Sequence, residues 1–148
     1  MRRLGPMAVV VLGALALAGC TAPAAQDDAP SADTAAREES RDRVTELVAS
    51  LAAPQPDAFA FARDAAIASA EGVELIGIES YEPETPEGPF GSLSFRTPVD
   101  ASLFPDAAEA FCFQAPLAES GPVSVDGDSF VEDIDCPVDV VEITPPPA

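Results

Sequence analysis

Two of the three cysteines are spaced so that their chemistry can be inferred. Cys112 and Cys136 lie 24 residues apart, on two stretches that alternate apolar and polar residues as strands do. A redox-active thiol pair favours the Cys-x-x-Cys arrangement, which is absent. In an oxidising compartment such a pair normally forms a disulfide, so we expect these two cysteines to be joined. The N-terminal segment, which leads to the third cysteine, indicates that compartment.

The segment before Cys20 has the layout of a secretory signal. Arg2 and Arg3 precede an uncharged run over residues 7–18, and small residues stand just before the cysteine. The run is about a dozen residues long, whereas a membrane-spanning helix needs about 20. We therefore expect the segment to be removed rather than to remain as a membrane span.

The end of this segment, Leu17-Ala18-Gly19-Cys20, resembles the lipobox of bacterial lipoproteins. In that class the cysteine thiol is lipidated, the chain is cleaved just before it, and the new amino terminus is acylated. The resemblance implies that residues 1–19 are a signal peptide and that Cys20 carries acyl chains such as palmitate. Several chains hold a protein stably on the cell membrane, here on the extracytoplasmic face. The alternative is an ordinary secretory signal that happens to contain a cysteine.

An acidic stretch beginning with residues 126–129, Asp-Gly-Asp-Ser, is the candidate cation site. Together with Glu132, Asp133 and Asp135 it offers the oxygen ligands that calcium prefers. The spacing does not match an EF-hand, which needs a further ligand before the glycine and a glutamate at the twelfth position. A solvated hairpin tip is the simpler interpretation, and we assign no metal site.

No catalytic residues are predicted. Histidine is absent, which removes the usual general base and the usual zinc or copper ligand. Asp133 and Asp135 could share one face of a strand as an acid–base pair, but a chain with 26 acidic residues contains such pairs by composition alone. No lysine or histidine is present to activate a serine or threonine. We expect a protein that is not an enzyme and that needs no cofactor.

The charge balance excludes nucleic acid as a ligand. Removal of residues 1–19 would leave five arginines against 26 acidic residues, a net charge of about −21. Such a surface repels nucleic-acid phosphates and anionic lipid headgroups. We expect contact with the membrane through the lipid anchor only, and we regard an envelope protein as the candidate partner.

Two helices should follow a disordered tether. Residues 20–36 contain no large apolar side chain and predict the tether. Apolar residues recur at helical spacing over residues 34–53, and a second helix should run over residues 57–72. The short connection at residues 54–56 contains two prolines and makes the two helices a hairpin.

Beyond the helices the sequence takes on strand character. Four strands are expected, over residues 73–81, 92–97, 110–115 and 130–141. Gly77 indicates a bulge in the first strand, and Pro137 indicates an edge or a break in the last. Residues 37–144 then form one small domain, and residues 145–148 form a disordered tail.

These elements predict an α+β domain in which an N-terminal helical hairpin packs on one face of a roughly four-stranded antiparallel sheet. The pattern of an acidic lipoprotein with helices, then strands, then a late cysteine pair resembles the small lipoproteins of high-GC actinobacteria. That resemblance implies no activity. The sequence favours a lipid-anchored, non-enzymatic interaction module of the cell envelope. An extracytoplasmic protein that binds a cation or small ligand is the alternative, and an envelope hydrolase ranks third.

Overall fold

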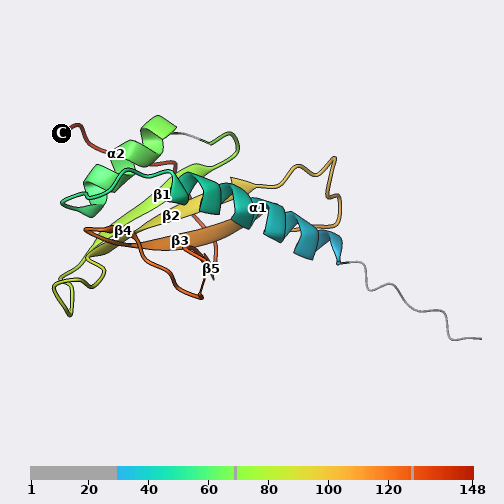
Figure 1. The fold of residues 1–148 in the computed structure, drawn as a ribbon. Coiled ribbons are helices and arrows are strands. Elements are labelled where there is room, and N and C mark those ends of the chain that lie inside the picture. The colour runs from blue at the N-terminus through green and yellow to red at the C-terminus, as the bar shows by residue number, and fades with distance from the viewer. Residues whose placement is uncertain (1–29, 69, 128) are drawn as a thin grey trace, which may run out of the picture.

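The computed structural model describes residues 30–68, 70–127 and 129–148. These ranges contain two helices and five strands in chain order: α1 (Ala32–Ala49), α2 (Ala58–Ala68), β1 (Glu74–Ser80), β2 (Gly91–Pro98), β3 (Ala110–Ala118), β4 (Gly121–Pro122) and β5 (Glu132–Ile134). All strand pairs are antiparallel. The α+β class is therefore confirmed (Figure 1). The predicted signal peptide, residues 1–19, and Cys20 lie outside the described residues.

Helix α1 begins earlier than the sequence predicted. Ser31 caps it, and the Ser31 hydroxyl accepts a hydrogen bond from the Thr34 N–H at 3.2 Å. Residues 32–36, which we assigned to the tether, are therefore helical, and the domain starts before residue 37. Alanine has the highest helix propensity of all residues, and Ala36 is buried against the core. A stretch without large side chains can thus belong to the fold.

The start of α2 agrees with the prediction, but its end does not. The Asp57 carboxylate accepts a hydrogen bond from the Ala60 N–H at 2.8 Å, as an N-cap should. The helix ends at Ala68 rather than continuing to Gly72. Gly72 instead takes a φ of 75° in the turn before β1, a conformation that glycine adopts without steric cost.

The core lies between the helices and one face of the sheet. In Figure 1 both helices lie on the same side of the sheet, α2 over β1 and β2 and α1 beside β3. Large side chains from both layers are fully buried there, among them Val44, Val48, Phe61, Leu93, Phe95, Phe113 and Leu117. The pairing of the two helices as a hairpin stays a prediction. Neither helix in the described ranges has the length and apolar character that crossing a membrane requires.

The sheet order is β1-β2-β3, and both β4 and β5 pair with β3. The predicted bulge is present between Leu75 and Gly77. The predicted strand over residues 130–141 is wrong for most of its length, because only Glu132–Ile134 pairs with β3. Proline cannot donate a ladder hydrogen bond, and the chain leaves the sheet just before Pro137.

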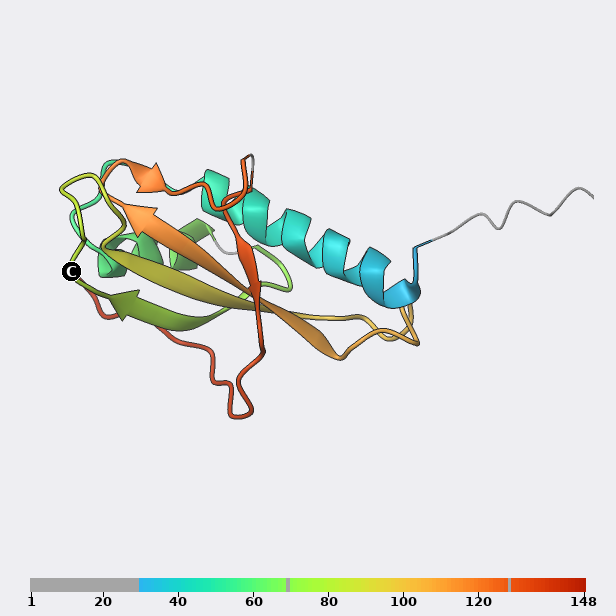
Figure 2. The ribbon, with the colours of Figure 1, turned by 90° about the horizontal axis from the view of Figure 1, so that it is seen from below.

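The chain then crosses the sheet as a segment that we call the C-terminal strap, residues 136–146. Figure 2 shows it running from the β5 side across the face opposite the helices and on to β1. There the Ile143 N–H donates a hydrogen bond to the Leu75 carbonyl oxygen at 2.7 Å. Residues 145–148 have no regular secondary structure, and their predicted disorder stays a prediction.

Candidate functional site

The disulfide between Cys112 and Cys136 is present, as predicted, with a Cα–Cα distance of 5.1 Å. It lies on the sheet face opposite the helices. Cys112 is 3% exposed on β3, whereas Cys136 is exposed at the start of the strap. The alternation of Cys136 with Val138 suggested an apolar face, but Val138 is 99% exposed. The bond therefore ties the strap to β3 and contributes no side chain to the helix-covered core.

The acidic stretch near β5 is engaged in other contacts. The Asp133 carboxylate contacts the guanidinium of Arg41 and lies 3.9 Å from that of Arg37. Asp135 lies beyond the end of β5, so the two aspartates do not form a pair on one strand. Within the described residues, which omit Asp128, no three His, Cys, Asp or Glu side chains lie close enough together to hold a metal ion.

Asp133 instead belongs to a contact between α1 and the β3 edge that sequence reasoning missed. Arg37 and Arg41 lie on α1, and Arg41 precedes Asp133 by 92 residues in the sequence. The guanidinium of Arg37 also lies over the Phe111 ring, 4.5 Å from its centroid, which adds a cation–π interaction. These contacts link α1 to β3 and β5.

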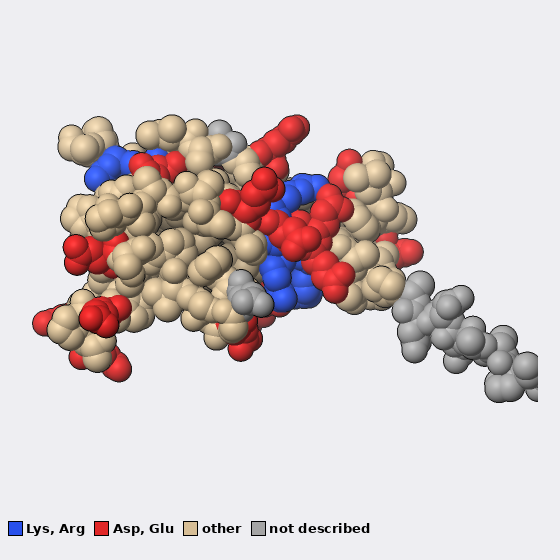
Figure 3. Space-filling view, in the orientation of Figure 1, with Lys and Arg blue, Asp and Glu red and all other residues tan. Residues whose placement is uncertain are grey.

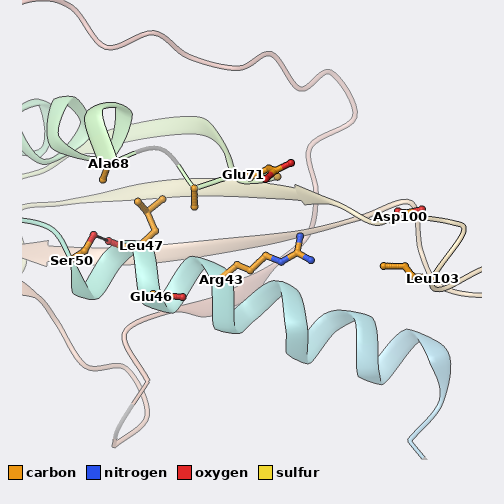
Figure 4. Close-up of a pocket in the computed structure, with 10 residues that line it drawn as sticks. Arg43, Glu46, Leu47, Ser50, Ala68, Glu71, Asp100 and Leu103 are labelled. Atoms are coloured by element: carbon orange, nitrogen blue, oxygen red, sulfur yellow. Dashed lines mark hydrogen bonds between the residues drawn. The ribbon is translucent and has the colours of Figure 1, made fainter.

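A groove of about 690 Å³ lies on the surface of the domain. It lies between α1, the turn before β1 and the loop between β2 and β3, as Figure 4 shows. Ala68 at the end of α2 also lines it, and its charged and large apolar side chains come from those three segments: Arg43, Glu46 and Leu47; Glu71; and Asp100 and Leu103. No single stretch of sequence contains the groove, which explains why no motif indicated it.

The groove carries more negative than positive charge. Arg43, its one cation among the described residues, pairs with Glu39 one turn earlier on α1. Glu46, Glu71 and Asp100 form no ion pair within the described part of the chain. The Asp100 carboxylate accepts hydrogen bonds from the Ser102 hydroxyl at 2.6 Å and the Ser102 N–H at 2.8 Å. These bonds hold the pKa of Asp100 below its usual value.

Apolar surface accompanies this charge. Leu47 is buried, and Leu103 is 65% exposed at the outer end of the groove. Gly72 lets the Arg43 guanidinium lie close to the turn before β1, because a Cβ atom there would lie 3.2 Å from Nη1 of Arg43. The geometry suits a ligand with a cationic group beside an apolar one.

Acidic side chains are not confined to the groove. In Figure 3 they gather over α1, where they mix with arginines, and around the loop between β1 and β2. That loop exposes Glu82, Glu84 and Glu87 and lies at the opposite end of the domain from the start of α1 (Figure 1). These distant carboxylates provide a control for charge effects at the groove.

The chain matches no protein-family model, and neither the curated proteins nor the solved structures contain a match to it.

Proposed function

We propose that this protein is a lipid-anchored, non-enzymatic interaction module of the cell envelope, held on the extracytoplasmic face of the cell membrane by Cys20. Ten residues lie between Cys20 and the Ser31 cap, a span of at most about 40 Å. The start of α1 and the loop between β2 and β3 lie together, since the Ala108 N–H donates to the Asp33 carboxylate at 3.1 Å. In this proposal that end of the domain faces the membrane, and a helical hairpin covers one face of the sheet.

The groove is the observation that carries the interaction role. Glu46, Glu71 and Asp100 lack cationic partners within the described residues, and Leu47 and Leu103 lie beside them. A protein segment that places an arginine or lysine near the carboxylates and an apolar side chain on the leucines would satisfy both features. Aligned charges of this kind raise the association rate and select the partner.

A small organic cation is the second candidate ligand. The groove volume of about 690 Å³ falls within the range of about 300–1,000 Å³ that is typical of small-molecule sites. Its wide opening to solvent favours a protein segment, because small ligands are usually buried over most of their surface.

Charge-neutralising variants test the groove. The assay cross-links the lipidated protein to its envelope partner in membranes. We expect the unchanged protein to capture this partner and the double variant Glu71→Gln, Asp100→Asn to lose it. The matched control is Glu84→Gln combined with Glu87→Gln, which removes the same charge far from the groove and should keep the partner. Equal capture by both double variants would contradict the proposal.

The second candidate is tested with the same proteins. Thermal melts with arginine, spermidine and choline as probes measure whether a small cation stabilises the fold. A rise in Tm that only the groove variant loses would favour the small-ligand alternative over a protein partner.

The anchor is tested separately. Cells expressing the full chain should incorporate labelled fatty acid into it, and Cys20→Ala should lose both the label and membrane retention, because the thiol is the acylated atom. A Cys20→Ala protein that is processed and retained normally would contradict the lipoprotein assignment. It would leave the groove experiment unaffected.

A further inference from the structure

The outer edge of β1 is open to pairing with a further strand. Within the described residues β1 pairs with β2 on one side only. An edge strand offers unpaired backbone N–H and C=O groups to any extended segment that lies beside it. Here the strap provides one backbone hydrogen bond to that edge, from Ile143 to Leu75. Alternate residues of this seven-residue strand direct their backbone groups outward, and those beyond Leu75 are therefore available for further strand pairing.

The strap nevertheless shows that an extended segment fits this position. Its residues 142–145 line one small cavity together with Ala65 and Ala66 of α2 and Leu75 of β1. Ile143 is partly buried there, whereas Val141 is 74% exposed. A cavity of about 120 Å³ remains beside the strap. The site between α2 and the β1 edge thus accepts an extended backbone with one inserted apolar side chain, and it is incompletely filled.

The strap matches this site only in part. The Arg63 guanidinium of α2 donates a hydrogen bond to the Pro146 carbonyl oxygen at 3.5 Å, but the β1 side of the site is acidic and so is the strap. The strap carries Asp139 and Glu142 and no basic residue, while β1 contributes Glu74 and Glu79. Glu74 pairs with Arg96, but Glu79 forms no ion pair within the described residues. Prolines follow Thr144 and have no N–H with which to extend the ladder.

We propose that the β1 edge beside α2 is a strand-addition site for an extended, basic segment of a partner protein, and that the C-terminal strap is a cover that this segment displaces. The disulfide keeps the displaced strap attached at Cys136, so the strap competes at a high effective concentration. The inference does not rest on the groove, which lies between other segments. Charge complementarity also argues against a second copy as the occupant, because two strongly acidic domains repel each other.

A pair of peptides tests this assignment. The probe is a labelled peptide of residues 139–146 with Asp139→Lys and Glu142→Lys, and its comparison is the peptide of unchanged sequence. Binding is measured by fluorescence anisotropy to the full chain and to Ile143→Pro, which removes the hydrogen-bond donor of the strap. Val141→Pro is the matched control, because Val141 is exposed and leaves the Ile143 donor in place.

We expect the lysine peptide to bind Ile143→Pro about tenfold more tightly than it binds the full chain or Val141→Pro. In the latter two proteins the strap covers the β1 edge, so only a fraction of the molecules can bind the peptide. Binding should weaken with salt, and the unchanged peptide should bind less well. Ile143→Ala, which keeps the backbone intact, replaces Ile143→Pro if that variant does not fold. The lysine peptide with alternate backbone nitrogens methylated should not bind, because it cannot form a ladder.

Three results would overturn the proposal. The first is a methylated peptide that binds as well as the unmodified one, which would leave only charge attraction. The second is equal binding of the lysine peptide to the full chain and both strap variants. The third is a dimer of Ile143→Pro in the absence of peptide, seen by sedimentation, which would assign the edge to a second copy.

Discussion

Replacing both Cys112 and Cys136 by alanine measures how much the disulfide stabilises the domain. The bond closes a loop over a sequence separation of 24 residues. The loop-closure relation assigns a loop of this length about 3.5 kcal/mol of lost denatured-state entropy. A domain of this size has about 5–15 kcal/mol of unfolding free energy in total, so the loss is a large fraction of it. We expect the Tm to fall by about 10–20 °C.

The structure also indicates where the variant should change first. β5 pairs with β3 over three residues only, and the strap meets β1 through one backbone hydrogen bond. Without the disulfide the strap should open far more often than the core unfolds. Limited proteolysis of the double variant should therefore cut near Val138, which is already 99% exposed, while circular dichroism below the transition stays close to that of the parent.

Three controls make the measurement decisive. Reduction of the unchanged protein should reproduce the lower Tm, and Val138→Ala should leave the Tm in place because its side chain is exposed. Each single cysteine variant should melt no higher than the double variant and should form intermolecular dimers through the remaining thiol. Identical melts with and without reductant, or two free thiols in the freshly isolated denatured protein, would refute the reasoning.

Three further predictions concern single sites. Gly91→Ala should destabilise the fold by about 1–3 kcal/mol, seen as a lower denaturant midpoint, because a Cβ atom there would collide with the backbone carbonyl of Glu79; an unchanged midpoint would contradict this. Burial, followed by the charges of Glu79 and Glu132, raises the pKa of Tyr81, the one tyrosine of the chain. The folded protein then keeps the phenol proton to higher pH than the unfolded chain, so this contribution to stability is lost as the pH rises beyond about 10; ultraviolet titration of the folded and the denatured protein should give different midpoints. Asp133→Asn should cost about 1 kcal/mol or less, because its contact with α1 is partly exposed, and the difference should shrink in high salt.

Local periodicity determined the elements that the sequence predicted correctly. The apolar spacing around Val44 and the cap at Asp57 identified both helices. The alternation of Phe111 and Phe113 identified β3, and the glycine at position 77 marked the bulge in β1. Each of these signals lies within a few residues of the feature that it predicts, so no knowledge of the remaining chain was needed.

The last predicted strand failed because its alternation was compatible with two structures. Residues 130–141 carry the pattern of a half-buried strand, yet Val138 faces solvent and the strap crosses the sheet to β1. Whether these residues form a strand or a strap depends on their contacts with β3 and β1, which lie elsewhere in the sequence. The tether boundary failed for a related reason: Ala36 is helical and buried because α1 packs on the sheet.

The sequence by itself determined the residue chemistry: three cysteines, no histidine or lysine, a strong excess of carboxylates and the resemblance to a lipobox at Cys20. It also indicated that Cys112 and Cys136 would pair, because an even pair in an oxidising compartment has one simple outcome. Only the tertiary structure brought Arg43, Glu71 and Asp100 around one groove, and only it placed the strap on the β1 edge. Those sites join segments that lie far apart along the chain. Their geometry depends on how the helices, loops and strap pack on the sheet, which local sequence patterns do not encode.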